Sequence, residues 1–503
     1  MRPDVYLRNG AAIALDNVRR LSVSDFRTSV LSGIEEGARL AALFASPDEE
    51  GLSLFAVLAW RDSGQLSVAA ARVADSYPAL TPECAQAHLF EREIAEQWGV
   101  VPEGHPWLKP VRFGGARRPG GHRGGTEAAA HACGVMDFFR IEGEEVHEVA
   151  VGPVHAGIIE PGHFRFQCHG ETVFHLEISL GYQHRGVERA LTGGPDRRTI
   201  HYVETLAGDT TAGHAMAYCR AIEALTRARV PARAQVIRGV AQELERIANH
   251  VGDLGALAGD IGFLPTMSYC GRIRGDVLNL TAMLCGNRFG RGIMRPGGVG
   301  FDMDAEVAAE MARRLETVLR DAESAVGLLW ETPSVLARFE GTGALSSETA
   351  ERIGLVGVAA RASGVGCDAR LDFPYGIFRL SHIPMTTWDT GDVFARAFVR
   401  WLEIQRSAAF VREQLDALPD GPTREAVGTP AARHLAVAMV EGWRGEICHV
   451  ALTDAQGRLA HYKVVDPSFH NWFGLACAMR DQQISDFPLC NKSFNLSYCG
   501  HDL

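Results

Sequence analysis

One long stretch, residues 231 to 262, constrains the fold more than any other part of this 503-residue chain. Apolar residues recur there at steps of three and four, which is the period of a core-facing helix. They are Val240, Leu244, Ile247, Val251 and Leu254. Pro231 suits the first turn of a helix, where its missing N–H does no harm. The spacing therefore predicts a long helix, and Gly252, Gly255 and Ala256 leave one side small enough for a close neighbour.

A second stripe on the same predicted helix carries charge. Its members are Glu243, Arg246, His250, Asp253 and, if the helix continues through the glycine before it, Asp260. Such a row is either buried against a polar cavity or forms a solvated face with ion pairs at spacings of three and four. Periodicity leaves both interpretations open.

The composition is that of a globular protein, with 46% hydrophobic and 22% charged residues. A formal net charge of −11 argues against a general nucleic-acid binder. The sequence has no apolar run long enough to span a membrane, and its first residues lack the apolar core of a secretory signal. We therefore expect a cytoplasmic chain that reaches the membrane only through partners.

The eleven cysteines are scattered and form no C-x-x-C pair. A zinc ribbon or an iron–sulfur cluster held by this chain is therefore poorly supported. We expect reduced, mostly buried thiols. Cys490 and Cys499, near the C-terminus, are the two that merit closer inspection.

The predicted fold class is α+β, with a small N-terminal α/β domain over residues 1–113, a linker over 114–145 and a mainly helical body over 146–503. We expect short sheets near 146–180, as strand–turn–strand, and near 447–465, as a hairpin. The glycine- and arginine-rich start of the linker cannot build a core. A nucleic-acid-binding arm is the less favoured interpretation of its arginines, because no aromatic residues are interleaved with them.

The familiar phosphate-loop, serine-hydrolase and zinc-protease motifs do not occur in the sequence. The glycine-rich run 292–300 lacks the strand and helix of a dinucleotide site, so a tight turn is expected there.

Several unusual strings occur in one order along nearly the whole chain, and together they resemble one family. Glu91–Gly99 with Glu103–Pro106 is similar to the small peripheral-arm subunit of respiratory complex I. The remaining strings resemble the large subunits shared by complex I and the energy-converting [NiFe]-hydrogenases. They are Gly152–His155, Glu160–Arg165, Gly181–Glu188, Glu243–His250, Arg295–Val299, Ser363–Arg370, Glu441–Glu446 and Asp466–Phe469. The two modules are fused here, as in formate-hydrogenlyase-type or hydrogenase-4-type large subunits.

The resemblance implies partners and site residues. It implies an iron–sulfur small subunit whose [4Fe–4S] cluster faces His184 and Arg185, and membrane subunits that pump ions. It places Glu204 where a proton-linked glutamate precedes the metal ligands, and a buried salt-bridged acid is the alternative for this residue. The alternative for Arg185 is a structural ion pair with Glu188 or Glu204.

The same resemblance exposes missing ligands. The four nickel-binding thiolates would fall at Ala207, Thr210, Ser497 and Gly500. Thiolates are the ligands that suit this soft metal site. Because none of the four positions carries a cysteine, we expect no metal centre in this chain. We also expect no cofactor held by this chain alone.

The resemblance weakens a quinone site of the family's kind. The quinone-binding histidine and tyrosine would fall at Pro161 and Gly208, which offer no side-chain hydrogen bond. Asp260 matches the acidic partner of that histidine. His155, His163 and His214 are alternative donors, although each is more simply a core histidine.

Two functions remain open from the sequence. The first is a core peripheral subunit of a membrane-bound complex I-like or hydrogenase-like oxidoreductase. It transfers electrons to a quinone or to another acceptor and couples this transfer to ion translocation. Its catalytic residues would be Glu204, Glu243, Arg246, His250 and Asp260. The second is a non-catalytic scaffold that docks the iron–sulfur subunit. The missing thiolates favour the scaffold, and the charged row on a core helix favours the enzyme.

Overall fold

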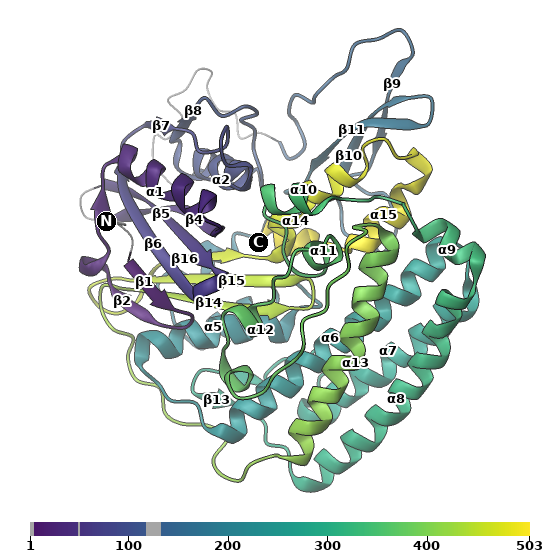
Figure 1. Ribbon diagram of the computed structural model, residues 1–503. Helices are drawn as coiled ribbons and strands as arrows, with labels where there is room; N and C mark the ends of the chain where they lie inside the picture. Colours follow the sequence, from purple (N-terminus) through teal and green to yellow (C-terminus); the bar gives the residue numbers. More distant parts are fainter. Residues whose placement is uncertain (1–4, 49–50, 117–131) are drawn as a thin grey trace.

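The helical body is arranged around one central helix, α6 (Ala232–Asp260), as the sequence predicts (Figure 1). The computed structural model describes residues 5–48, 51–116 and 132–503. Helices α7 (Leu264–Cys285) and α13 (Val393–Asp416) pack directly on α6, and α8 (Ala305–Glu331) packs on both of them. A helix of this length extends for roughly 44 Å, so α6 traverses most of the body.

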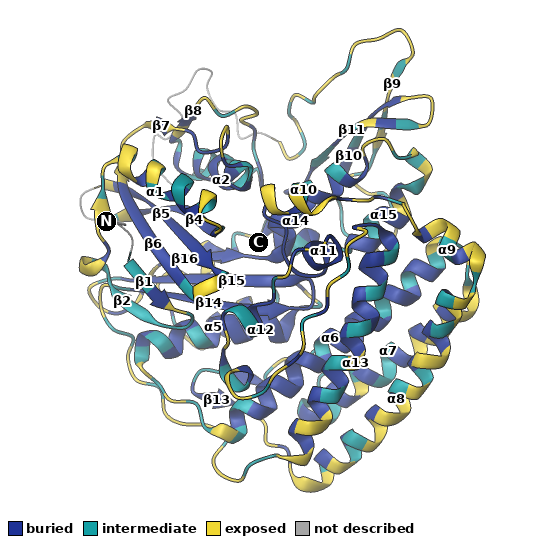
Figure 2. Ribbon diagram, in the orientation of Figure 1, coloured by how far each residue is buried: buried dark blue, intermediate teal, exposed yellow. Residues whose placement is uncertain are grey.

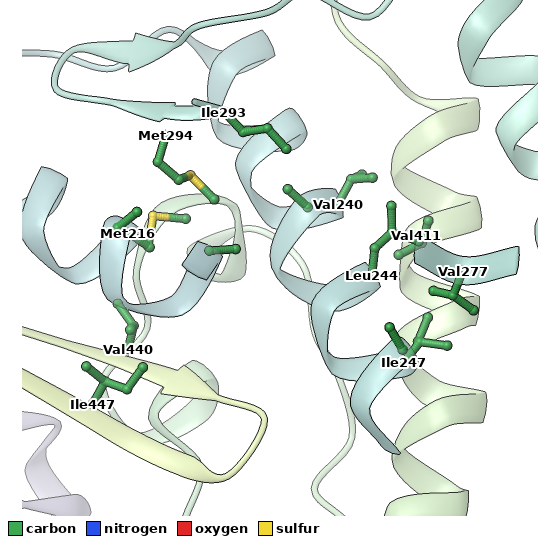
Figure 3. Close-up of a cluster of buried hydrophobic side chains, with 14 of the residues drawn as sticks. Met216, Val240, Leu244, Ile247, Val277, Ile293, Met294, Val411, Val440 and Ile447 are labelled. Carbon is green, nitrogen blue, oxygen red and sulfur yellow. The ribbon is translucent and has the colours of Figure 1, made fainter. Parts of the chain in front are cut away.

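The apolar stripe of α6 fills the core of this body. Val240, Leu244 and Ile247 are fully buried and face Val277 of α7 and Val411 of α13 (Figure 3). The burial view shows the same pattern, with the inner faces of these helices buried and the outer face of α8 exposed (Figure 2). Burial extends beyond this stripe to most residues of α6, so the helix lies inside the body.

The small residues on one side of α6 allow the close approach of a neighbouring helix, as predicted. A Cβ atom added at Gly255 would lie 2.7 Å from the Cβ of Cys270 on α7, and one added at Gly252 would lie 2.7 Å from Arg274. Helix α7 therefore approaches α6 closely because α6 has no side chain at these positions.

The N-terminal unit is an antiparallel sheet in the order β1 (Val5–Arg8), β6 (Gln65–Val73), β5 (Gly51–Trp60), β4 (Arg39–Asp48). A short strand, β3 (Arg20–Leu21), adds to β6 in parallel. Helices α1 (Val23–Glu35) and α2 (His88–Trp98) cover the sheet, and β7 (Ser76–Pro78) pairs with β8 (Val101–Glu103) beside α2. The sequence predicts strands over 53–60 and 65–73 around a turn at 62–65, which are β5 and β6, and a helix over 82–98, of which 88–98 is α2.

A second sheet joins this unit to the body. Its order is β16 (Leu459–Val465), β15 (Gly445–Thr453), β14 (His434–Gly442), β2 (Ala12–Ala14). The predicted 447–465 hairpin is β15 and β16, whereas β14 carries no alternation that distinguishes it in sequence. Because β2 comes from the N-terminus, the N-terminal unit and the C-terminal sheet share one apolar core.

A three-stranded sheet projects from the body, in the order β11 (Thr172–Ser179), β10 (His163–His169), β9 (Val146–Val151) (Figure 1). The sequence predicts only the two outer strands. The central strand is missed although its sequence alternates, with the buried Phe164, Phe166 and Cys168 separated by Arg165 and Gln167.

The remaining elements are short, apart from two helices that pack on the C-terminal sheet, α5 (Thr211–Thr226) and α14 (Pro467–Ala478). The others are α3 (Val187–Leu191), α4 (Thr199–Val203), β12 (Met294–Arg295), β13 (Gly298–Val299), α9 (Pro333–Phe339), α10 (Ser347–Arg352), α11 (Gly357–Ala362), α12 (Ala369–Asp372), α15 (Phe487–Phe494) and α16 (Tyr498–Asp502). Strands β12 and β13 form the tight turn predicted for 292–300, with Gly297 at φ +83°. The α+β class is confirmed.

The predicted linker is described only in part. Residues 114–116 and 132–145 contain no helix or strand. The arginine-rich run 117–131, and with it the nucleic-acid alternative, lies outside the described residues. None of the helices among the described residues has the length and apolarity to cross a membrane. All eleven cysteines are free, and Cys133 is the exposed one.

Candidate functional site

The charged row of α6 is buried, which excludes the solvated-face interpretation. Glu243, Arg246 and His250 are fully buried and Asp253 is 4% exposed. An ionised group in such a place is stable only if other charges or hydrogen bonds compensate for the lost water. The structure provides these partners from α13, from the segment around α11 and α12, and from the turn between β14 and β15.

Glu243 lies between two arginines. Its Oε2 accepts from Arg246 at 3.0 Å, from Arg370 at 2.9 Å and from the hydroxyl of Ser407 at 2.7 Å. Burial alone would raise the pKa of Glu243, but the two arginines and the hydroxyl outweigh it and hold that pKa below its usual range. Glu243 is therefore a fixed negative charge that positions both arginines.

Glu403 of α13 is the centre of the network. It accepts from His250 Nε2 at 2.9 Å and from Arg361 at 2.6 Å, and Arg246 lies 3.4 Å away. Burial would raise the pKa of Glu403, yet Arg361 and the His250 hydrogen bond hold it well below its usual range. For His250, burial outweighs the pull of Glu403 and lowers its pKa, so its ring is neutral at neutral pH.

The turn between β14 and β15 completes the network. Arg246 donates to the carbonyl oxygens of Glu441 (2.7 Å) and Gly442 (3.1 Å), and the Glu441 carboxylate accepts from Arg361 (2.8 Å) and from the main-chain N–H of Ala369 (2.9 Å). Burial and the nearby Asp368 raise the pKa of Glu441 to about 7 against the pull of Arg361. Glu441 is thus the acid of this network that can exchange a proton near neutral pH.

Three polar atoms of the network have no hydrogen-bond partner among the described residues. They are Glu243 Oε1, His250 Nδ1 and Arg361 Nε. Buried polar atoms are nearly always paired, so unpaired ones mark places where water or a moving proton is accommodated. The network therefore keeps spare hydrogen-bonding capacity at these three atoms.

The two remaining acids of α6 differ from each other. Asp253 pairs with Arg400 of α13 at 2.8 Å and accepts from Asn495 at 2.5 Å. Asp260 ends the helix in an exposed position, about 10 Å further along the axis. Partial burial raises its pKa and Lys492 opposes that shift. The row therefore continues to Asp260 along the helix, but the structure does not bring Asp260 into the buried network.

Two segments far apart in sequence meet beside this network. Arg444, in the β14–β15 turn, binds both oxygens of Asp209 (2.6 and 2.8 Å), the hydroxyl of Thr210 (3.2 Å) and the carbonyl of Asn495 (2.5 Å). It thereby holds the 207–210 loop against the segment that leads into α16. Burial would raise the pKa of Asp209, but Arg444 keeps it below its usual range.

Arg185 connects the same two segments from the other side. Its guanidinium donates to the carbonyl oxygens of Thr205 (2.7 Å), Leu206 (2.9 Å) and Cys499 (3.4 Å). Glu188, one of the carboxylates considered for it, pairs with Lys463 at 3.1 Å. Arg185 thus uses main-chain carbonyls to hold the loop and the C-terminal segment together.

Glu204 is buried just after α4 and is ion-paired. It accepts from Arg295 (2.9 Å) and from the main-chain N–H of Gly292 (2.8 Å), with His201 at 3.5 Å. The structure therefore shows the salt-bridged acid, and a proton-carrying role for Glu204 stays a prediction. Its partners come from the β12–β13 turn, which explains the glycine-rich run there.

His184 and Arg185 lie on the surface in a hollow of about 520 Å³, together with Arg189 and Gly115. His184 Nδ1 lies 2.7 Å from the carbonyl oxygen of Asp502, which fixes the ring against α16. Among the described residues, two arginines and no acid line the hollow, so it suits an electronegative partner surface.

The other predicted histidines are distributed over the projecting sheet and the core. His155 is half-buried in the β9–β10 loop, 3.3 Å from the hydroxyl of Tyr498. His163 is buried on β10, where Arg165 Nε lies 3.3 Å from its ring, and burial lowers its pKa. His214 is a core histidine in contact with Asp466 at 3.0 Å. His155 therefore contacts the C-terminal segment through Tyr498 of α16.

Sequence reasoning missed several residues of the network. They are Arg361, Arg370, Glu403 and Glu441, together with the pair Asp209 and Arg444. A signal was available on α13, where Arg396, Arg400, Glu403 and Ser407 recur at helical spacing. The long-range partners on loops carry no such periodic signal.

The fold and the site define an α+β protein with its ionisable groups inside a helical body and a basic hollow on its surface. Residues 260–433 match the family model of the 49 kDa subunit of respiratory-chain NADH dehydrogenase. The chain is 33% identical to the carbon monoxide-induced hydrogenase of Rhodospirillum rubrum, over 69% of this chain and 97% of the relative. It is 27% identical to formate hydrogenlyase subunit 5 of Escherichia coli, over 84% of this chain and 76% of the relative. It is 30% identical to NADH-quinone oxidoreductase subunit 4 of Thermus thermophilus, over 68% of this chain and 90% of the relative.

The chain belongs to this family, which joins 49 kDa-type subunits of NADH dehydrogenases to subunits of hydrogenases. The family resemblance predicted from the sequence strings is confirmed.

The residues at the four expected nickel positions do not fit a nickel–iron group. Ala207 and Gly500 have no donor atom, and the Thr210 and Ser497 hydroxyls already bind Arg444 (3.2 Å) and the N–H of Gly500 (2.9 Å). A Cβ atom at Gly500 would lie 2.7 Å from the carboxylate of Asp466. Cys499 alone offers sulfur there, and burial raises its pKa to about 11, which disfavours the thiolate.

Proposed function

We propose that this chain is a core peripheral subunit of a membrane-bound oxidoreductase complex of the NADH-quinone oxidoreductase and hydrogenase kind, without a nickel–iron centre of its own. It lies on the inner face of the cell membrane, held there by partner subunits. It docks an iron–sulfur subunit and links the arrival of electrons to proton movement through its buried network.

The observation that carries this proposal is the double contact made by the β14–β15 turn. Glu441 and Gly442 bind Arg246 of the central helix, while Arg444, two residues further, binds Asp209. The loop that holds Asp209 is bound in turn by Arg185 at the surface hollow, through Thr205 and Leu206. A charge change at the surface therefore reaches the buried network through one loop and one turn.

The docking surface is proposed to consist of the hollow around Arg185 and the exposed loop between β9 and β10. Val154 and Ile158 of that loop are 79% and 99% exposed. Large apolar side chains at such exposure are typical of interfaces. Positive charge from Arg185 beside a partner's [4Fe–4S] cluster, next to the His184 ring, would favour the reduced cluster.

The electron acceptor is proposed to be a quinone or a related molecule that is held differently from the family's quinone. Pro161 and Gly208 offer no side-chain hydrogen bond. By contrast, Tyr498 of the 497–500 segment supplies a hydroxyl, and the imidazole of His155 lies next to it. His163 is a further donor on the adjoining strand. Proton exchange is assigned to Glu441, whose pKa is raised to about 7, and to Glu204 and Asp260.

The test is co-purification followed by turnover. An affinity-tagged chain should retain an iron–sulfur subunit and membrane subunits, and an Arg189→Glu variant should lose the iron–sulfur subunit. Arg320→Glu, on the exposed face of α8 (74% exposed side chain), is the matched control and should retain it. The retained complex should reduce a quinone. A complex that assembles but turns over no donor–acceptor pair would support the scaffold function instead, and loss of partners in both variants would contradict the docking surface.

A further inference from the structure

A large cavity lies between the N-terminal unit and the rest of the molecule, away from the charged network. Its volume is about 640 Å³. Helix α2 and residues 105–111 form one wall, the end of β11 forms another, and α14 forms the floor. A volume of this size accommodates a small molecule of the kind that binds in protein clefts.

The walls of the cavity are mostly apolar and aromatic. Leu89, Leu176 and Phe473 line it, and Trp107 and Phe139 stand at its edge with ring centroids 6.1 Å apart. Trp107 and Phe139 are 42% and 41% exposed, although they are large aromatic residues. Such rings pack well against the face or edge of another flat molecule.

Two buried hydrogen-bond donors of the cavity have no partner among the described residues. They are the hydroxyl of Ser179, at the end of β11, and the indole Nε1–H of Trp472, on α14. The two residues are only 4% and 3% exposed. A buried indole N–H almost always finds an acceptor, because leaving it unpaired costs free energy. Both donors therefore indicate an acceptor that enters the cavity.

The charged groups at the cavity are already paired within the protein. Glu177 accepts from Lys109, from Trp107 Nε1 (3.1 Å) and from the N–H of Phe139 (2.8 Å). Arg92 donates to the carbonyl oxygens of residues 109 and 110 at 2.9 and 2.8 Å. Burial lowers the pKa of His88 to about 3, so this imidazole is neutral. No unpaired charge among the described lining residues awaits an ionic ligand.

From the aromatic walls and the two unpaired donors we infer that this cavity binds an uncharged, flat, apolar molecule with a carbonyl oxygen. The oxygen accepts from Trp472 Nε1 and Ser179 Oγ, and the ring lies against Trp107, Phe139 and Phe473. This site is separate from the surface hollow around Arg185 and from the meeting point of the 207–210 and 497–500 segments, so it stands independently of the proposed function.

The experiment compares two probes of nearly equal size and shape, the ketone 2-acetylnaphthalene and the hydrocarbon 2-ethylnaphthalene. Equilibrium dialysis measures their binding to the full chain. The wild-type chain should bind the ketone more tightly. Trp472→Phe and Ser179→Ala should each weaken ketone binding about three- to tenfold, the loss expected for one neutral hydrogen bond. Both variants should leave hydrocarbon binding unchanged.

Two further variants make the result decisive. Trp330→Phe removes another buried, unpaired indole N–H, on α8, and should leave ketone binding unchanged. Ala476→Leu fills part of the cavity and should weaken both probes. Equal binding of the two probes to the wild type, absence of ketone binding, or equal effects of Trp472→Phe and Trp330→Phe would each overturn the inference.

Discussion

Arg444 binds both carboxylate oxygens of Asp209, at 2.6 and 2.8 Å, and its Nε donates to the carbonyl oxygen of Asn495 at 2.5 Å. One guanidinium thus closes the space between two segments at the place where relatives of the hydrogenase kind are expected to hold a metal. The arrangement supplies a fixed positive charge at this place and holds the two segments together.

Removing this guanidinium should destabilise the region. Arg444→Leu leaves Asp209 partly buried without its partner, and the free energy of unfolding should fall by about 3 kcal/mol. Urea unfolding followed by circular dichroism measures the change. Adding Asp209→Asn to Arg444→Leu should restore part of the loss. A double variant as unstable as the sum of the single variants would show that the two residues do not interact.

The two glutamates of the buried network should respond to pH in opposite directions. The pKa of Glu441 is raised from 4.5 to about 7 in the folded chain, so its contribution favours folding at low pH and is lost as pH rises from about 4.5 to about 7. Glu403 has a lowered pKa, so its contribution is present above the unfolded value and is lost as pH falls.

The stability of Glu441→Gln relative to the wild type, measured between about pH 4.5 and 7, and that of Glu403→Gln, measured as pH falls below about 4.5, check these signs. Stability of Glu441→Gln relative to the wild type should rise with pH, and that of Glu403→Gln should fall. Two difference curves with the same slope would contradict the assigned pKa directions.

The close contact of α6 with α7 gives a test with an internal control. Gly255→Ala should destabilise the chain by about 1–3 kcal/mol, because its Cβ atom would lie 2.7 Å from Cys270 Cβ. Gly271→Ala and Gly275→Ala, on α7, meet no atom within 4 Å and should stabilise the helix by up to about 1 kcal/mol. Thermal unfolding of the three variants distinguishes packing from helix propensity. A stabilised Gly255→Ala would refute the packing.

The proton role of Glu204 and Asp260 is tested in the assembled complex. If they carry protons, Glu204→Gln and Asp260→Asn should each reduce quinone turnover about a hundredfold. Subunit composition should stay unchanged. Asp276→Asn, on the exposed surface of α7, is the control and should keep full turnover. Full turnover in Glu204→Gln would leave this residue as the structural partner of Arg295.

The sequence predicts the helices and hairpins that depend on locally repeated patterns. It misses the elements that depend on pairing between distant segments. The length of α6, its apolar stripe and its small face follow from residues three and four apart, and the β5–β6 and β15–β16 hairpins follow from alternation around a turn. Strand β2 is only three residues long and owes its place to pairing with β14, more than four hundred residues away. No local pattern indicates such a pairing.

The candidate site divides in the same way. Glu243, Arg246 and His250 were found because they share one helix face. Their partners, Glu403 and Arg361, were not found, because each comes from another element and its role is defined only by burial against α6. Periodicity could not decide between a buried and a solvated row. The burial of Glu243, Arg246, His250 and Asp253, each with a partner on another element, decides it.

Elemental analysis of the purified complex tests the central claim most directly, the claim that this chain works beside an iron–sulfur partner without a nickel–iron centre. The account predicts iron in proportion to the partner's clusters and nickel only at background level. Nickel in equimolar amount with this chain, lost when Cys499 is replaced by serine, would contradict it.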